Sequence, residues 1–590
     1  MTAANTPYPQ ALGGALLGEV SAERLMDYDR NIAQWVRLSG SEDEAKAFDY
    51  VDKTLQSWGI QTERYAPVCL VSWPGPATLT ILGSGQSLDC ITHSFSTATG
   101  PDGLTAEVVY AGGGAEADYA GKDVAGKIVL TEGLAGPAKV APAERHGALG
   151  VINISGDIVH EMIVSPVWGS PTPETVGELP HIPHISITTE AGERLKEELA
   201  RGPVRVRITT EVDTAWRPLP VLVGHVTPSR PSAFADEYVM FSGHIDSWHY
   251  GAMDNGSANA TQMEVARILA GHRDLLKREL RLAFWSGHSH ARYGSSAWFA
   301  DEFFYDLSDH CVAHVNIDGP GALNATVLTN APTMAESYPL AREVIQALSG
   351  QELAYRRIGR MGDQSFWGVG IPAFFCGLSS QGPSPESDAL AAGRSHSTGR
   401  RSGGTAWWWH TTEDTIDKID PELLARDCRI LLATVYRLVT DPVVALDQAA
   451  AVDEIQRSLA EIAGAAGDAF DLAAVADEAE GLLAAARRLQ ARCQQPATDE
   501  QAHRLNACLM RLSRLLLPVN YTMHGPFEQD LALQYSSLPG LRPAATLAAL
   551  PPHSQERHLL EVKLRRERNR VRHALREARA TVEQTLAAVG

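Results

Sequence analysis

The stretch Phe241-Ser-Gly-His244-Ile-Asp246-Ser-Trp-His-Tyr-Gly-Ala-Met-Asp254-Asn-Gly256 is the most informative part of this chain. It continues an apolar run, Tyr238–Phe241, that is typical of a buried strand. His244 and Asp246 lie two residues apart at the end of this strand, so their side chains are expected on one face. Asp254 follows in a glycine-flanked loop that can return a carboxylate to the strand end. This grouping is typical of a metal site in an open α/β sheet, although an ion-paired histidine beside a turn aspartate is a simpler alternative.

Three further segments end in residues of the same kind. Leu280–Trp285 is strand-like and is followed by Ser-Gly-His288-Ser289-His290. Cys311–Ile317 is a second strand-like run, with Asp318 at its glycine-rich end. His410 follows three tryptophans and precedes a helix start. Polar groups at the ends of several strands are expected to gather into one site.

With these segments the chain resembles peptidase family M28, a family of zinc aminopeptidases and carboxypeptidases. The resemblance implies that His244 and Asp318 hold one metal ion, that His410 holds another, and that Asp254 bridges the two. Asp246 would orient His244, as ligand histidines usually require. The implied cofactor is one or two divalent ions, with zinc as the first expectation and manganese, cobalt or nickel as alternatives.

One segment departs from the family pattern. The family has a Glu-Glu pair, a base followed by a metal ligand, where this chain has His288 and Ser289. A serine hydroxyl is a poor zinc ligand, whereas a neutral imidazole is a good one. We therefore expect His288 to be the catalytic base, since an imidazole titrates near working pH, and His290 to replace the missing ligand. Two alternatives stay open: His288 is the ligand and no base remains, or both histidines lie outside the metal shell and the second ion is absent.

The domain organisation follows from composition and from the same resemblance. The expected fold class is α/β, a metallopeptidase-type mixed sheet flanked by helices, with two added domains. Residues 1–85 would begin the catalytic domain, 86–214 would form an inserted β-rich protease-associated domain, 215–445 would complete the catalytic metallohydrolase domain, and 446–590 would form a helical dimerisation domain. The order resembles that of glutamate carboxypeptidase II and the transferrin receptor, which implies a homodimer.

Local signals support the helical parts of this layout. Ser41 and Glu44 form a capping-box pattern at the start of a helix that Gly59 ends. In the last domain, helical patterns run over 452–492, 498–517 and 554–588.

Two loops are candidates for contact with a substrate. The stretch 377–405 is long and without periodicity, which favours a lid over the metals. The aromatic and polar segment 520–530 could reach the substrate from the helical domain. Several arginines could receive a carboxylate, and the sequence does not rank them: Arg292, Arg356, Arg357, Arg360, Arg394, Arg400 and Arg401.

Composition limits the partners and the compartment. A net charge of −20 over 590 residues argues against nucleic acid as a partner. No apolar run is long enough to span a bilayer, and the first residues do not form a secretory signal, so no membrane partner is expected. The seven cysteines are scattered and include no Cys-x-x-Cys, which favours reduced thiols in a cytoplasmic protein.

The functional expectation is therefore an M28-type exopeptidase that cleaves a peptide or amide bond through metal-activated water. Its substrate would be a small peptide, an N-acyl amino acid or another small amide. The alternative is a non-peptidase metalloenzyme on the same fold, such as a lyase or a small-molecule amidohydrolase. A receptor-like homologue without catalysis is the third interpretation.

Overall fold

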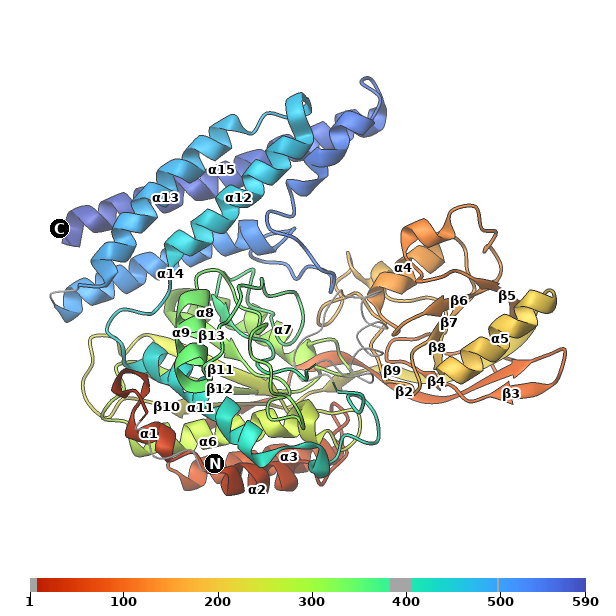
Figure 1. Ribbon diagram of the computed structural model, residues 1–590, viewed down its shortest axis with the longest axis horizontal. Coiled ribbons are helices and arrows are strands. Elements are labelled where there is room, and N and C mark those ends of the chain that lie inside the picture. Colours follow the sequence, from red (N-terminus) through yellow and green to blue (C-terminus); the bar gives the residue numbers. More distant parts are fainter. Residues whose placement is uncertain (1–7, 383–405, 496–497, 590) are drawn as a thin grey trace.

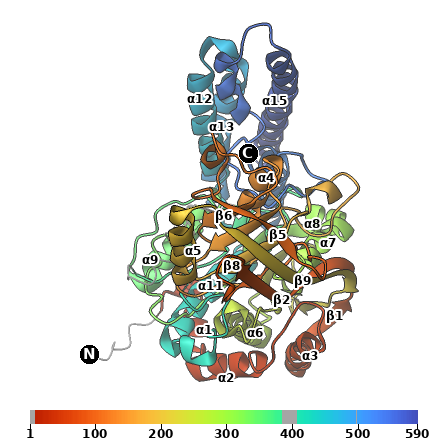
Figure 2. The ribbon, with the colours of Figure 1, turned by 90° about the vertical axis from the view of Figure 1, so that its right-hand side faces the viewer.

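The computed structural model describes residues 8–382, 406–495 and 498–589, and it forms three parts (Figures 1 and 2). A central α/β domain lies below a bundle of long helices, and a smaller sheet domain lies beside it (Figure 1). Residues 383–405, which include most of the expected lid and Arg394, Arg400 and Arg401, lie outside the described residues.

The central sheet is mixed, as the sequence predicts. Among the described residues it has six strands in the order β1-β10-β12-β11-β13-β14. The strands β12, β11, β13 and β14 are parallel to one another, whereas β1 and β10 join antiparallel at one edge. Their bounds are β1 Gln61–Tyr65, β10 Val221–Val226, β11 Tyr238–His244, β12 Glu279–Trp285, β13 Cys311–Asn316 and β14 Ala373–Phe374.

Each face of this sheet has its own apolar core, because successive strand residues point to opposite faces. Along β11, Val239 and Phe241 belong to the core that includes α6, whereas Tyr238 and Met240 belong to the core that includes α7 and α8. The catalytic-domain helices are α1 Ala15–Gly18, α2 Ala22–Ile32, α3 Glu42–Ser57, α6 Ser257–Gly271, α7 Gly294–Glu302, α8 Phe304–His310, α9 Tyr338–Ser349 and α11 Pro421–Thr440.

The predicted entry helix is α3. The Ser41 hydroxyl accepts a hydrogen bond from the Glu44 backbone N–H, as expected for an N-cap. The Glu44 carboxylate, however, accepts from the backbone N–H of Gly40, one residue before the cap. The helix ends at Ser57, and Gly59 takes a positive φ of 71° in the turn into β1.

The insert begins earlier than the expected boundary at residue 86. Strand β2 already belongs to the second sheet, where it pairs with β9, so the two long strands lead the chain out of the central domain and back. This sheet contains β2 Val68–Ile81, β3 Gln86–Leu88, β4 Ile91–Thr92, β5 Leu104–Tyr110, β6 Ile128–Glu132, β7 Gly150–Ile154, β8 His184–Ile187 and β9 Arg205–Pro218, and it carries α4 Pro137–Arg145 and α5 Thr189–Arg201.

The last part is helical, as predicted, with its own apolar core. The expected helical stretch 452–492 is two helices, because the chain turns between them at Gly467, where φ is +52°. The helices are α12 Gln448–Ala466, α13 Ala473–Cys493, α14 Asp499–Tyr521 and α15 Gln555–Val589. In the described part of the chain, no helix combines the length and apolar character needed to cross a membrane.

Candidate metal centre and its cavity

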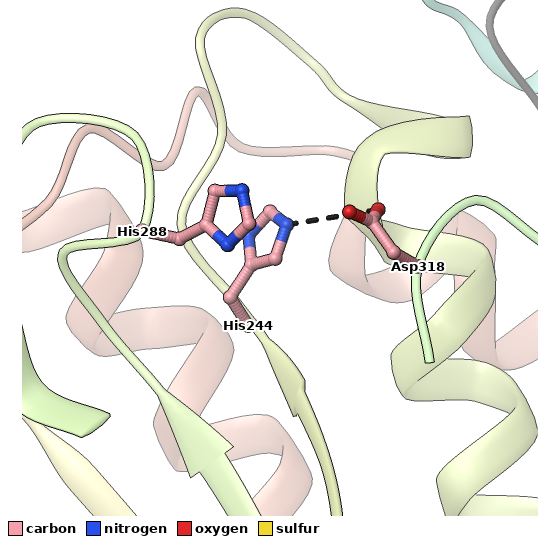
Figure 3. A group of neighbouring side chains, drawn as sticks. All are labelled: His244, His288 and Asp318. Carbon is pink, nitrogen blue, oxygen red and sulfur yellow. Dashed lines mark ion pairs between the residues drawn. The ribbon is translucent and has the colours of Figure 1, made fainter. Parts of the chain in front are cut away.

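The site lies at the carboxyl edge of the parallel strands. Strand β11 ends at His244, whose Nδ1 lies 2.9 Å from the backbone carbonyl of Asp246. With Nδ1–H donating to that carbonyl, Nε2 is the ring nitrogen that faces the carboxylates. It lies 3.2 Å from Oδ1 of Asp254. It also lies 3.8 Å from Oδ1 of Asp318, the ion pair marked in Figure 3. The sequence-predicted groups on β11, its loop and the end of β13 are thus brought together.

His410 joins the site from the opposite side of Asp254. Its Nε2 lies 3.0 Å from Oδ2 of Asp254, so this carboxylate stands between two imidazoles. The Nδ1 of His410 lies 2.6 Å from the backbone carbonyl of Glu161, in the insert. The insert therefore helps to fix the His410 ring.

His288 completes the cluster. Its ring stacks on His244, with centroids 3.7 Å apart and planes 19° from parallel (Figure 3). One nitrogen of each histidine and one carboxylate oxygen of Asp318 lie within 4.8 Å of one another. The Nδ1 of His288 lies 3.0 Å from Oδ2 of Asp363, a buried carboxylate.

Two atoms of this cluster fit a divalent cation. Nε2 of His244 and Oδ1 of Asp254 are buried and have no hydrogen-bond partner among the described residues, although they face each other. Burial would lower the pKa of His244, but Asp246, Asp254 and Asp318 hold that pKa well above its ordinary value. The carboxylates around this buried imidazole create a region of negative charge, which a bound divalent cation would neutralise.

Asp246 supports His244 and the loop after β12 together. Its carboxylate accepts hydrogen bonds from the Ser39 hydroxyl at 2.7 Å and from the backbone N–H of Ser289 at 2.8 Å. Burial opposes ionisation, but the nearby His244 imidazole, together with His288 and the Ser39 hydroxyl, holds the Asp246 pKa below its ordinary range. An ionised Asp246 thus links three segments around the metal ligands.

His290 is not brought into this group. Its Nδ1 lies 3.0 Å from the Ser39 hydroxyl, and its ring packs on Trp248, 4.3 Å between centroids. Burial lowers its pKa to about 4. Trp248 also packs on His410, 5.5 Å between ring centroids, so the indole contacts both histidines.

Two functional neighbours were missed by the sequence reasoning. Asp363, which accepts from His288, lies outside the segments that the sequence analysis singled out. Asp414, four residues after His410, accepts from the backbone N–H groups of Met253 and Asp254. For Asp414, the available signal was an aspartate four residues after an expected metal ligand.

The cluster opens into a cavity of about 450 Å³ built by all three parts of the chain. The insert contributes Leu134–Ala138, Met162 and Ile163. The catalytic domain adds His288, Arg292, Arg360 and neighbouring apolar residues. The helical domain adds residues 532–534, which directly follow the segment 520–530 expected to reach the substrate.

The sequence matches two family models. Residues 222–435 match peptidase family M28, and residues 104–195 match the PA domain. Carboxypeptidase Q from Xenopus laevis is 27% identical over 283 residues, which cover 45% of this chain and 58% of that protein. Carboxypeptidase Q from Bos taurus is 27% identical over 291 residues, with 45% and 57% covered. The chain thus spans a little over half the length of these curated relatives.

Solved structures share the fold. The aminopeptidase from Aneurinibacillus sp. strain AM-1 has a TM-score of 0.53 at 23% identity and covers 72% of this chain and 95% of its own. BSAP, a zinc aminopeptidase from Bacillus subtilis, has a TM-score of 0.51 at 21% identity, with 72% and 96% covered. At this identity the likeness bears on the fold alone. The two sequence matches and the shared fold indicate a catalytic region similar to peptidase family M28, with a segment similar to PA domains before residue 222.

Proposed function

We propose that this protein is a metal-dependent hydrolase that cleaves a peptide or amide bond near a free terminus of a small substrate. One observation carries the proposal: Nε2 of His244 lies 3.2 Å from Oδ1 of Asp254 and 3.8 Å from Oδ1 of Asp318, at the wall of the cavity. When bound, a divalent cation would supply Lewis acidity that activates water and polarises a carbonyl.

The ligand set favours one tightly held ion. His244, Asp254 and Asp318 would supply three protein ligands, the number typical of a catalytic zinc site. His410 and Asp254 would be the two ligands of a second ion, since Ser289 stands where the family has a glutamate and its backbone is bonded to Asp246. The native ion would be zinc, with manganese, cobalt or nickel as alternatives.

His288 would serve as the proton acceptor rather than as a ligand. A ligand imidazole binds a metal in its ring plane, and two nearly parallel rings 3.7 Å apart do not direct their lone pairs to a common point. Asp363 holds one ring nitrogen, which leaves the other free to take a proton. The pair resembles the aspartate–histidine pairs in which the carboxylate fixes the tautomer of a catalytic base.

Metal analysis combined with kinetics tests these roles. The His244→Ala variant should lose stoichiometric metal, because it removes a ligand. The His288→Ala variant should keep the metal and lose about 100- to 10,000-fold in kcat, the usual contribution of a general base. The His290→Ala variant should keep the metal. Metal loss in His288→Ala would make His288 a ligand, and metal loss only in His290→Ala would restore the expectation from the sequence.

A non-peptidase metalloenzyme is the second candidate. The observation that favours it is the replacement of two carboxylates by His288 and Ser289, which makes the site about two charge units less negative than the family pattern. A panel of dipeptides, N-acyl amino acids and other small amides, tested with metal-loaded protein, separates the two candidates. Turnover of any peptide supports the peptidase.

Two further properties are part of the proposal. The helical domain would form a homodimer, and light scattering after gel filtration would give the mass of two chains at micromolar concentration. The protein would work in the cytoplasm, with its seven cysteines reduced, which thiol titration of freshly isolated protein measures.

A further inference from the structure

The charged side chains that line the cavity are divided by sign. The carboxylates are Asp254 and Asp318, and both belong to the metal cluster. The remaining fixed charges of the described lining are two arginines, Arg292 and Arg360. Away from the metal, the cavity therefore presents positive charge to a substrate.

Arg292 has no partner that explains its position. Within residues 8–382, 406–495 and 498–589, no carboxylate lies within ion-pair distance of its guanidinium, and its buried Nε has no hydrogen-bond acceptor. Its guanidinium carbon lies 5.5 Å from the centre of the Tyr293 ring. An unpaired, partly buried cation is costly, so its retention points to a ligand.

The backbone holds Arg292 in place. Arg292 and Tyr293 have positive φ angles of 47° and 69°, which residues other than glycine rarely adopt. The carbonyl of Arg292 accepts from the backbone N–H of Gly169 at 2.6 Å, and the N–H of Tyr293 donates to Gly287 at 2.8 Å. Such conformations cluster where a protein positions a functional side chain.

Arg360 faces the same space from another segment. It is 3% exposed, it stacks on Trp168 at 4.1 Å, and one of its terminal nitrogens donates to Gln529 and to the Asp530 carbonyl. Burial lowers its pKa to about 10, although the charge of nearby Asp530 acts in the opposite direction. Its Nε has no acceptor among the described residues. Two guanidinium groups thus line the same cavity, and neither forms an ion pair with a carboxylate of the described residues.

We propose that Arg292 and Arg360 bind a carboxylate of the substrate, so that the preferred substrates are N-acyl amino acids or short peptides with a free carboxylate next to the cleaved bond. Guanidinium groups bind carboxylates with directed, charge-assisted hydrogen bonds. A free ammonium group would instead meet these two cations, since the carboxylates of the described lining are at the metal. The apolar lining, which includes Leu134, Ile163 and Leu533, suits an aliphatic side chain beside the carboxylate. The inference rests on the proposed hydrolase function.

Equilibrium binding tests the anchor without requiring turnover. Isothermal titration calorimetry of the metal-loaded His288→Ala variant, in which turnover should be slow, would compare N-acetyl-leucine with N-acetyl-leucinamide, which differ only in the carboxylate. We expect the acid to bind at least tenfold more tightly. Equal affinity for the two compounds would overturn the proposal.

Variants assign that preference to the arginines. Arg292→Gln should bring the acid to within about twofold of the amide. The Arg292 Nε makes no hydrogen bond in the described residues, so we expect the variant to keep its fold. Arg360→Lys should reduce the preference while keeping the buried charge. Arg230→Gln removes an exposed charge paired with Asp274 and should leave the preference unchanged. A preference that survives in Arg292→Gln but disappears on metal removal would assign the carboxylate to the metal and overturn the anchor.

Hydrolysis assays separate this inference from the proposed function. If the acid is preferred in binding but no peptide or amide is turned over, the anchor stands and the hydrolase proposal fails. If N-acyl dipeptides and their C-terminal amides are cleaved with equal kcat/KM, the hydrolase proposal stands and the anchor fails.

Discussion

At the scale of single residues, the site depends on carboxylates that hold imidazoles in fixed orientations. Asp363 is the clearest case, because its Oδ2 is the partner of His288 and its Oδ1 is buried without a hydrogen-bond donor in the described chain. A buried carboxylate beside one imidazole contributes little to the stability of the fold, but it can stabilise the protonated form of a catalytic base.

We therefore expect Asp363→Asn to lower kcat by roughly 100-fold, within the range of general-base effects, and to leave KM and the metal content unchanged. The amide cannot balance the charge that the imidazole gains in the reaction. Steady-state kinetics with metal analysis measures this. Asp306→Asn, which alters a carboxylate paired with Arg281, is the control. A rise in KM with unchanged kcat would assign Asp363 to substrate binding instead.

Lys139 gives a prediction for stability at the same scale. It is buried in the insert, where its ammonium donates to the Glu132 carbonyl, and burial lowers its pKa to about 7 from 10.5. Between about pH 7 and pH 10 the unfolded chain binds a proton that the folded chain does not, so folding becomes more favourable as pH rises. Below pH 7 the full cost of a buried charge remains.

Thermal unfolding of the wild type and of Lys139→Met should therefore differ with pH. The variant should have the higher melting temperature at pH 7. The difference in melting temperature should decrease as the pH rises to 10, because the wild type becomes more stable. Lys122→Met, at an exposed position of the same domain, should show no such convergence. A constant difference between wild type and Lys139→Met across this range would contradict a depressed pKa.

At the scale of elements, the loop after β11 is held by the loop before α11. The Asp414 carboxylate accepts from Met253 N–H at 2.8 Å with one oxygen and from Asp254 N–H at 3.0 Å with the other. The ligand carboxylate of Asp254 is thus positioned by a residue from a segment distant in sequence.

An asparagine at position 414 has only one acceptor oxygen and would lose one of these bonds. We expect Asp414→Asn to weaken metal binding by about 10- to 100-fold, the usual effect of removing support behind a ligand. Competition with a chelator of known affinity measures the change. Glu413→Gln, at the exposed neighbouring position, should bind metal like the wild type.

The elements also explain which features the sequence could predict. The strand ends that carry His244 and Asp318 follow from local apolar runs, and parallel strands must bring them to one edge. The choice between His288 and His290 depends on how the loop after β12 folds back over Asp246, through the N–H of Ser289. That loop is set by tertiary hydrogen bonds, which local pattern does not encode. The early start of the insert was missed because β2 and β9 pair across more than a hundred residues.

At the scale of the whole molecule, the cavity is shared by parts that fold around separate cores. The helical domain contacts the catalytic domain through Arg514, which donates to the carbonyls of Ser308 and Gly370. Beyond α14 the chain continues to the cavity, where Gln534 donates to the Arg360 carbonyl at 2.9 Å. The substrate pocket therefore requires all three parts in one arrangement.

A substitution in the helical domain should for this reason change substrate binding without touching the metal. Leu533 lines the cavity and is partly exposed. A larger side chain at this position should therefore leave the fold intact and reduce the volume of the pocket. Leu533→Trp should raise KM for an N-acyl amino acid by about tenfold or more, with kcat, metal content and melting temperature close to those of the wild type. Ala545→Trp, at an exposed position of the same domain, should leave KM unchanged. A larger residue in a pocket wall should weaken the binding of a ligand that fills the pocket. An unchanged KM in Leu533→Trp would therefore mean that the helical domain supports the catalytic domain without contacting the substrate.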